Sequence, residues 1–254
     1  MSDSGRNEQQ WRAIDTALAA GADCLTPDMY QCAVVAQVQT DTAERWPLGP
    51  IERVSPVRYM VKGLFEEYAE TFERDQIVPS YHRMARLVLP SYLEYPFDEP
   101  GAIKRNIKEY GDLSWYLFNI AASHRINLAE SLGGRTATFR EIDTMARTQA
   151  MEASGLAWRL PGHNYVFHAT ELLQAVVEMG EPLPAGNVEL FLKRRDHLAR
   201  RASNLLTAVS VLLQSKFDTG LADVLYGNLV KVEERAATGT TLNAVGDDRE
   251  LRTA

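Results

Sequence analysis

Apolar residues recur with the period of an α-helix along most of the chain, and this pattern restricts the fold more than any other feature. It predicts helices over residues 6–21, 28–45, 57–74, 101–124, 139–154, 164–180, 187–215 and 220–237, and a short helix inside 75–100. Thr26 and Pro27 form a favourable helix start, because threonine caps a first turn and proline suits its first position. No segment alternates polar and apolar residues between hairpin turns. We therefore expect an all-α fold.

The net charge of −7 argues against a nucleic-acid polymer as partner, although an acidic protein can hold a small polyanion through a metal ion. Cys24 and Cys32 match no zinc spacing, and we expect both to be reduced. Residues 1–10 lack a basic start followed by an apolar run, and no apolar stretch is long enough to span a bilayer. These features predict a cytoplasmic protein with no membrane partner.

Residues 126–132 (INLAESL) resemble residues 219–225 (TGLADVL), and each stretch follows a long apolar helix and a short polar break. The comparison places Glu67 opposite Glu171, Glu70 opposite Gln174, Glu109 opposite Arg201, and Asp112 opposite Asn204. We therefore expect two related helical halves, the second of which has lost most of its acidic groups. The predicted parts are an N-terminal helix (1–24), the acidic half (25–135), the degenerate half (136–237) and a polar tail (238–254) whose composition favours disorder.

Two pairs of carboxylates have the spacing of a shared helix face, Glu67 with Glu70 and Glu109 with Asp112. Such a pair taken alone is more often a solvated surface. Here both pairs lie within apolar helices, and Gly111 permits close approach of a second helix. Four carboxylates between two helices would repel one another unless a cation lay among them, and their hard oxygen ligands suit Mg²⁺. These four residues are the candidate metal ligands.

A basic group follows near the end of the last predicted helix. Lys231 and Arg235 are four residues apart and share a face, with Asn228 one turn earlier. Two cations and an amide in a row could bind a phosphate chain. The alternative is an exposed patch that pairs with Glu233 and Glu234.

Together these segments resemble the MazG-like all-α nucleoside triphosphate pyrophosphohydrolases, a superfamily that includes the dimeric dUTPases. The resemblance rests on residues 64–70 (LFEEYAE), 109–117 (EYGDLSWYL), 228–235 (NLVKVEER) and 246–249 (GDDR), and on 25–31 (LTPDMYQ), which look like the first helix of such proteins. It covers about residues 25–132 and 220–250. The fold that it implies is a MazG-like helical bundle.

The resemblance implies Mg²⁺-dependent (or Mn²⁺-dependent) hydrolysis of a nucleoside or deoxynucleoside triphosphate to a monophosphate and pyrophosphate, for control of the nucleotide pool. The metal-binding and catalytic residues would be Glu67, Glu70, Glu109 and Asp112. The phosphate-binding residues would be Asn228, Lys231, Arg235 and Arg249, with Asp248 helping to order the tail over the substrate. Glu66 or Glu67 would orient the attacking water. Trp115 or Tyr116 could stack on the base, although an aromatic residue in the core is the simpler interpretation of either.

The chain departs from the family pattern in one main respect, because about ninety residues separate Leu132 from Asn228. Duplication would explain the insertion: the first half supplies carboxylates and the second supplies the basic residues. The assembly would then be a homodimer or a pseudo-dimeric monomer with one working site per chain. A catalytically inactive nucleotide-binding or regulatory module and a purely structural helical bundle are the alternatives. The sequence has no Walker-type loop or nucleophile elbow, and His163 and His168 lack the spacing of a helical zinc pair.

Overall fold

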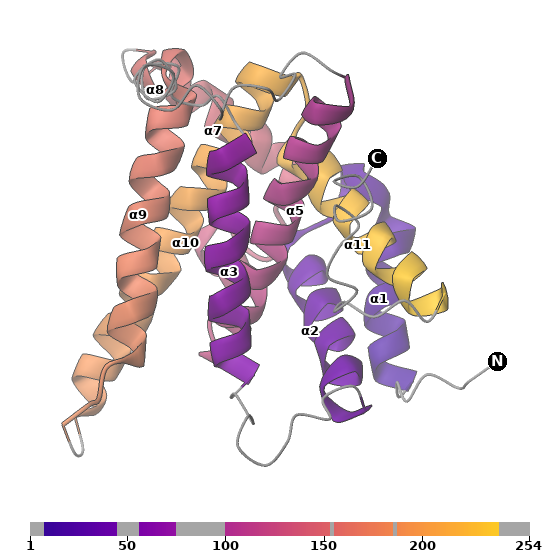
Figure 1. Cartoon of the computed structure of the whole chain (residues 1–254), viewed down its shortest axis with the longest axis vertical. Helices are drawn as coiled ribbons and strands as arrows, with labels where there is room; N and C mark the ends of the chain where they lie inside the picture. Colours follow the sequence, from indigo (N-terminus) through magenta and orange to yellow (C-terminus); the bar gives the residue numbers. More distant parts are fainter. Residues whose placement is uncertain (1–7, 45–55, 75–99, 153–154, 185–186, 239–254) are drawn as a thin grey trace, which may run out of the picture.

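The computed structural model describes residues 8–44, 56–74, 100–152, 155–184 and 187–238, and within them every regular element is a helix. The all-α prediction is therefore confirmed. In chain order the helices are α1 (Glu8–Cys24), α2 (Pro27–Glu44), α3 (Pro56–Arg74), α5 (Pro100–Ser123), α6 (Leu128–Ser131), α7 (Phe139–Glu152), α8 (Leu156–Arg159), α9 (Pro161–Gly180), α10 (Val188–Phe217) and α11 (Leu221–Thr238) (Figure 1).

Proline begins four of these helices, α2, α3, α5 and α9. Proline has no N–H to leave unsatisfied in a first turn, and its fixed φ already matches a helix. The amide of Met29 donates to Oγ1 of Thr26 at 3.2 Å, so Thr26 caps α2 as predicted. Helix α9 begins three residues earlier than predicted, because Pro161 is its first residue and does not belong to the preceding break.

The other differences from the predicted helices are small. Helices α6 and α8 have four residues each, which is too short for apolar periodicity to reveal. Gly21 (φ 64°) interrupts the helical geometry of α1 at the residue where the predicted helix ends. The short helix expected inside 75–100 and the polar tail lie outside the described residues. No helix in the described part of the chain is long and apolar enough to cross a membrane.

The helices of the two predicted halves are not separate in space. Helix α3 packs along α5 and α9 packs along α10, while α11 packs mainly against α5 and α1. Figure 1 shows α11 crossing beside α1 and α2, although it is the last described helix. The last helix of the predicted second half, α11, therefore packs into the group of helices formed by the first part of the chain.

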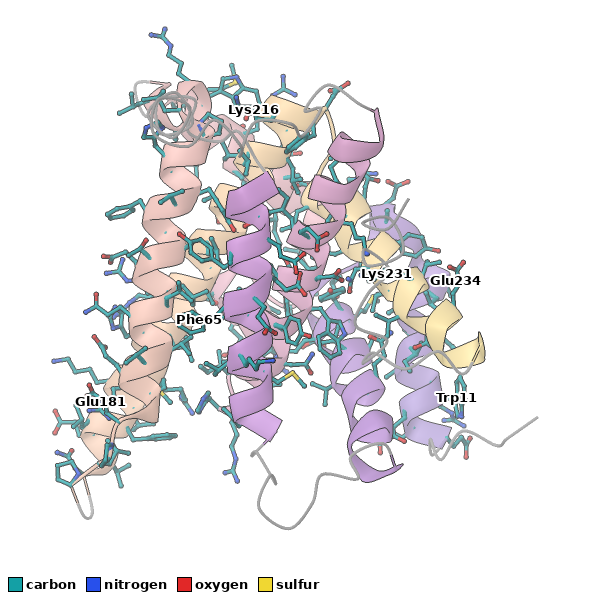
Figure 2. All side chains as sticks on the ribbon, in the orientation of Figure 1. Trp11, Phe65, Glu181, Lys216, Lys231 and Glu234 are labelled. Atoms are coloured by element: carbon teal, nitrogen blue, oxygen red, sulfur yellow. The ribbon has the colours of Figure 1, made fainter. Side chains whose placement is uncertain are left out.

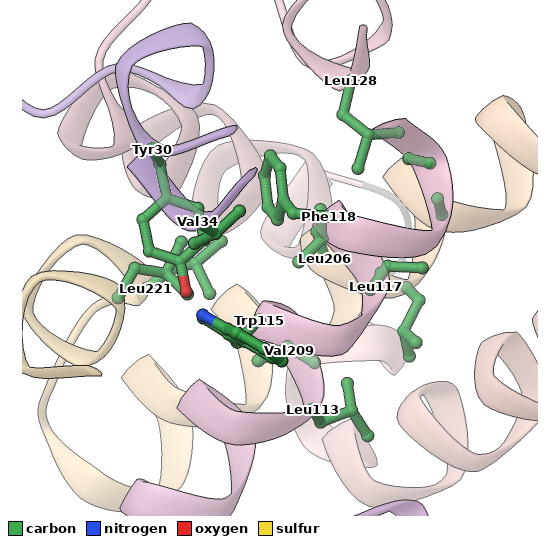
Figure 3. Close-up of a cluster of buried hydrophobic side chains, with 14 of the residues drawn as sticks. Tyr30, Val34, Leu113, Trp115, Leu117, Phe118, Leu128, Leu206, Val209 and Leu221 are labelled. Atoms are coloured by element: carbon green, nitrogen blue, oxygen red, sulfur yellow. The ribbon is translucent and has the colours of Figure 1, made fainter. Parts of the chain in front are cut away.

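The core is continuous and draws side chains from both halves (Figure 3). The ring of Tyr30 meets Phe118 and Phe139 edge to face, with ring centroids 4.9 and 5.9 Å apart. Leu206 of α10 and Leu221 of α11 are fully buried in the same cluster. Edge-to-face contacts stabilise aromatic pairs beyond the area that they bury.

The start of α11 is held by one buried carboxylate from α7. Asp143 accepts hydrogen bonds from the amides of Leu221 (2.9 Å) and Ala222 (3.2 Å) and from the hydroxyl of Ser210 (2.5 Å). The first amides of a helix have no partner within the helix, so Asp143 satisfies two of them from another element. This contact joins α7, α10 and α11 and sets the direction in which α11 leaves the core.

We expect Asp143→Ala to lower the free energy of unfolding by about 2 to 4 kcal/mol, because it removes a helix cap and leaves the hydroxyl proton of Ser210 and two backbone amides without their acceptor. Urea denaturation followed by circular dichroism would measure the change. Asp196→Ala, at an exposed position of α10, is the control and should leave the midpoint unchanged. Equal midpoints for the two variants would contradict the role given to Asp143.

Candidate metal centre

Three of the four predicted ligands meet between α3 and α5. Carboxylate oxygens of Glu67, Glu109 and Asp112 all lie within 4.8 Å of one another. Glu109 is buried, and Glu67 and Asp112 are largely buried. Within the described residues this is the one group of acidic, histidine or cysteine side chains found close enough to hold a metal ion.

Two glycines allow helices to pack closely around this cluster. A side chain at Gly63 of α3 would overlap the ring of Tyr116 on α5. A Cβ atom at Gly111 of α5 would lie 3.2 Å from Cβ of Asn228 and 3.3 Å from the carbonyl oxygen of Val224. The prediction that Gly111 permits close helix approach is confirmed, and the helix that approaches it is α11.

Glu67 experiences the strongest electrostatic effect in the cluster. Burial, the charges of Asp112 and Glu109, a hydrogen bond with Glu109 and the charge of Glu70 together raise the pKa of Glu67 to about 9. Its Oε2 atom is buried and has no hydrogen-bond partner. With no cation beside it, Glu67 therefore holds a proton at neutral pH.

Asp112 is the point where the first half of the chain meets α11. It accepts a hydrogen bond of 2.5 Å from Nδ2 of Asn228 and forms an ion pair with Lys231 through the same oxygen. Only about a fifth of each side chain in this ion pair is exposed (18% for Asp112 and 20% for Lys231). One chain thus brings two of the predicted phosphate-binding residues, Asn228 and Lys231, to one of the predicted metal ligands, Asp112.

Two side chains of α2 that the sequence analysis did not single out support this arrangement. The hydroxyl of Tyr30 donates to Oδ1 of Asn228 at 3.3 Å, and burial together with the charge of Asp112 raises the pKa of Tyr30. Gln37 accepts from the indole N–H of Trp115 at 3.0 Å and donates to Glu233 at 2.9 Å. Trp115 is buried, so its interpretation as a core aromatic is the one that the structure supports.

The remaining acidic candidates differ in their surroundings. Glu70 is not one of the three residues within 4.8 Å, but its charge contributes to the raised pKa of Glu67, so it lies near the same cluster. Glu66 is exposed and forms an ion pair of 3.0 Å with Lys62. Of the two candidates for orienting water, Glu67 alone belongs to the cluster.

The other basic candidates are only partly described. Arg235 lies in α11 one turn beyond Lys231, and its side chain is outside the described residues. Arg249 and Asp248 also lie outside them. Lys231 and Asn228 are therefore the basic and amide residues whose contacts are known, and Figure 2 shows Lys231 on the side of α11 toward α5.

The residues that the sequence comparison placed opposite Glu67 and Glu109 form an ion pair with each other. Arg201 of α10 contacts Glu171 of α9 at 2.5 Å. Arg201 also donates to Nε2 of His197 at 3.0 Å, and Nδ1 of His197 lies 3.2 Å from Glu178. The sequence comparison placed Arg201 opposite Glu109. Its guanidinium group neutralises Glu171, so this carboxylate has a counter-ion within the protein.

Comparisons with protein-family models, with curated proteins and with solved structures found no match to this chain. The MazG-like resemblance therefore rests on the residues given above.

We predict that Glu67 makes the stability of the metal-free protein fall as pH rises between 4.5, the usual value for glutamate, and about 9. In that window the folded state holds a proton that the unfolded chain has released, so rising pH favours unfolding. The Glu67→Gln side chain cannot ionise, so this variant should lack the fall in stability. The melting temperature of the variant minus that of the wild type should therefore increase with pH up to about 9. Thermal melts in chelator across the pH range would measure it.

Glu66→Gln is the matched control, one residue away and exposed, and its melting temperature should follow that of the wild type. Parallel pH profiles for Glu67→Gln and the wild type would show that Glu67 is ionised in the folded protein, contrary to the prediction.

Proposed function

We propose that this chain is a Mg²⁺-dependent pyrophosphohydrolase that converts nucleoside or deoxynucleoside triphosphates to monophosphates and pyrophosphate. The observation that carries the proposal is the convergence of Asn228 and Lys231 on Asp112, within a cluster of three carboxylates. Carboxylates beside a lysine supply both a metal site and a cation for phosphate, which is the combination that hydrolysis of a polyphosphate requires.

The residues of the cluster suit a magnesium ion. Glu67 has a buried oxygen atom without a hydrogen-bond partner and a pKa of about 9, so a divalent cation would relieve the repulsion that keeps this carboxyl protonated. Glu67, Glu109 and Asp112 would hold the ion, with Glu70 as the fourth ligand. When bound, Mg²⁺ neutralises phosphate charge and lowers the pKa of coordinated water.

The chain's own carboxylates would also handle the proton. Water attacks the α-phosphorus, the bond from this phosphorus to the bridging α–β oxygen breaks, and pyrophosphate leaves with that oxygen. The proton of the water passes to a carboxylate base. We assign this role to Glu67, because it lies inside the cluster whereas Glu66 is exposed and paired with Lys62.

Lys231 and Asn228 would act on the phosphate side of the site. The ammonium group of Lys231 is a compact charge on a flexible stem, so it can leave Asp112 for a phosphate oxygen when Asp112 binds a metal ion. The amide of Asn228 would keep Asp112 oriented during this exchange. Arg235, one turn further along α11, would extend the phosphate site.

We further propose that the chain is a duplicated, pseudo-dimeric MazG-like bundle with one working site. The ion pair between Glu171 and Arg201 supports this proposal, because it stands at the positions aligned with Glu67 and Glu109. A guanidinium and a carboxylate neutralise each other, so this second position has no need of a metal ion. The role of such an enzyme would be control of the nucleotide pool.

The test is release of pyrophosphate from a panel of NTPs and dNTPs in the presence of Mg²⁺. Asp112→Asn and Glu70→Ala should each lower kcat/KM by about a thousandfold, since loss of a metal ligand removes several kcal/mol of transition-state stabilisation. Glu189→Gln, at an exposed carboxylate on α10, is the control and should keep full activity. Hydrolysis that is indifferent to both substitutions would place the site elsewhere. Nucleotide binding without release of pyrophosphate would favour an inactive regulatory module.

Lys231→Met should raise KM for the nucleotide about tenfold or more, with a smaller change in kcat, if Lys231 binds the substrate in its ground state. Lys216→Met, which changes an exposed lysine on α10, should leave both constants unchanged. Steady-state kinetics at saturating Mg²⁺ would separate the two constants. A normal KM for Lys231→Met would mean that Lys231 serves only as the counter-ion of Asp112.

A further inference from the structure

Two hydrogen bonds in series connect Tyr30 of α2 to the candidate metal ligand Asp112 of α5. The hydroxyl of Tyr30 donates to Oδ1 of Asn228 at 3.3 Å, and Nδ2 of Asn228 donates to Oδ1 of Asp112 at 2.5 Å. Tyr30 is fully buried and Asn228 is only 4% exposed. Bulk water therefore does not compete for the hydroxyl of Tyr30 or for the amide between it and Asp112.

The surroundings of Tyr30 and Asn228 leave little freedom to either residue. The ring of Tyr30 meets Phe118 and Phe139 edge to face, and Figure 3 shows it among buried apolar side chains. The Cβ atom of Asn228 lies against Gly111, where an added Cβ would be only 3.2 Å away. The main freedom that remains in Asn228 is rotation of its amide group about the bond to Cβ.

The amide of Asn228 is held at both of its ends. An asparagine amide has an oxygen that accepts and a nitrogen that donates, and a half turn exchanges the two. In the observed orientation the oxygen meets a hydroxyl and the nitrogen meets a carboxylate. A half turn would leave the hydroxyl proton of Tyr30 without this acceptor inside the core and would place an amide oxygen against the carboxylate of Asp112. Both effects are costly, so Tyr30 and Asp112 oppose the turn together.

The donors to Asp112 leave its two oxygen atoms in different situations. Asn228 and Lys231 both donate to Oδ1, and neither of them uses Oδ2. A carboxylate that is fixed through one oxygen presents the other in a defined direction. Hydrogen bonds of this kind orient ligating carboxylates in metal sites and tune the affinity for the ion.

We propose that Tyr30 is a positioning residue for a divalent cation at the acidic cluster, and that it acts through Asn228 on the carboxylate of Asp112. The inference rests on the proposed function, because it requires a metal ion at this place. A cation would weaken the hold of Asp112 on the amide, since it shares the negative charge of the carboxylate and attracts the amide oxygen. The hydroxyl of Tyr30 is then the group that keeps the amide nitrogen turned toward Asp112.

Binding of Mn²⁺ alone, without nucleotide, tests this role independently of catalysis. A titration followed by electron paramagnetic resonance, which detects the free ion, would measure the dissociation constant. Tyr30→Phe keeps the ring and its aromatic contacts and removes only the hydroxyl. We expect this variant to bind Mn²⁺ about tenfold more weakly than the wild type, a loss typical of removing a group that orients a metal ligand.

Tyr226→Phe is the matched control. The hydroxyl of Tyr226 donates to the carbonyl oxygen of Leu18 at 3.4 Å, so it also joins α11 to a helix from the start of the chain, but that helix, α1, carries no residue of the cluster. A role limited to docking α11 would affect both variants alike. We expect Tyr226→Phe to bind Mn²⁺ as the wild type does, and the two variants to melt within a few degrees of each other.

Asn228→Ala tests the route by which Tyr30 acts. Asn228→Ala should itself weaken Mn²⁺ binding, and without the amide Tyr30 has nothing to orient. Adding Tyr30→Phe to this variant should therefore cause no further loss of affinity. A second tenfold loss in the double variant would show that Tyr30 acts on the site by another route, and would overturn the inference.

The remaining outcomes separate this inference from the proposed function. Wild-type affinity for Mn²⁺ in Tyr30→Phe would overturn the inference and leave the proposed function standing. Failure of the wild-type protein to bind Mn²⁺ would overturn the metal centre and the inference with it. In the pyrophosphate assay, the Mg²⁺ concentration for half-maximal activity should rise about tenfold in Tyr30→Phe, while KM for the nucleotide at saturating Mg²⁺ stays unchanged.

Discussion

Repulsion among the carboxylates of Glu67, Glu109 and Asp112 is the constraint that the packing of the surrounding helices must offset. Three carboxylates within 4.8 Å and largely out of water cannot all remain charged without compensation. The protein compensates with a proton on Glu67 and with the ammonium group of Lys231 and the amide of Asn228 on Asp112. Helix α11 is therefore as necessary to the cluster as the two helices that carry the acids.

Helix α7 contributes no residue to the cluster, yet it determines where α11 lies. Asp143 binds the first amides of α11, and Arg140 forms hydrogen bonds with Asp223 in the same turn at 2.6 and 2.8 Å. Arg140 also contacts Asp23 at the end of α1 at 2.9 Å. The buried carboxylate of Asp143 fixes the direction of α11, and the more exposed ion pairs of Arg140 add a smaller stabilisation. An element that looks like ordinary scaffold in the sequence is thus a positioning element for Asn228 and Lys231.

Local patterns in the sequence were sufficient to predict the helices and the acidic residues that share a helix face, because both depend on spacing within a single helix. These patterns could not show that Glu67 belongs to the cluster of three carboxylates and Glu70 does not. Both residues lie on the same face of α3, and only their neighbours from other helices differ. The patterns also gave no role to Tyr30 or Asp143, because the hydrogen bond of Tyr30 joins residues 198 apart and Asp143 caps a helix 78 residues away. The correspondence between the two halves remains a prediction.

The ion pair between Asp112 and Lys231 joins residues 119 positions apart, with α7, α9 and α10 between them in the chain. A nascent chain emerges from the ribosome in order, so α3 and α5 are made long before the helix that balances their charge. Until α11 docks, Asp112 lacks its contacts with Lys231 and Asn228. The contacts of Asn228 and Lys231 with Asp112 therefore form late, only when the last described helix docks onto helices that were synthesised well before it.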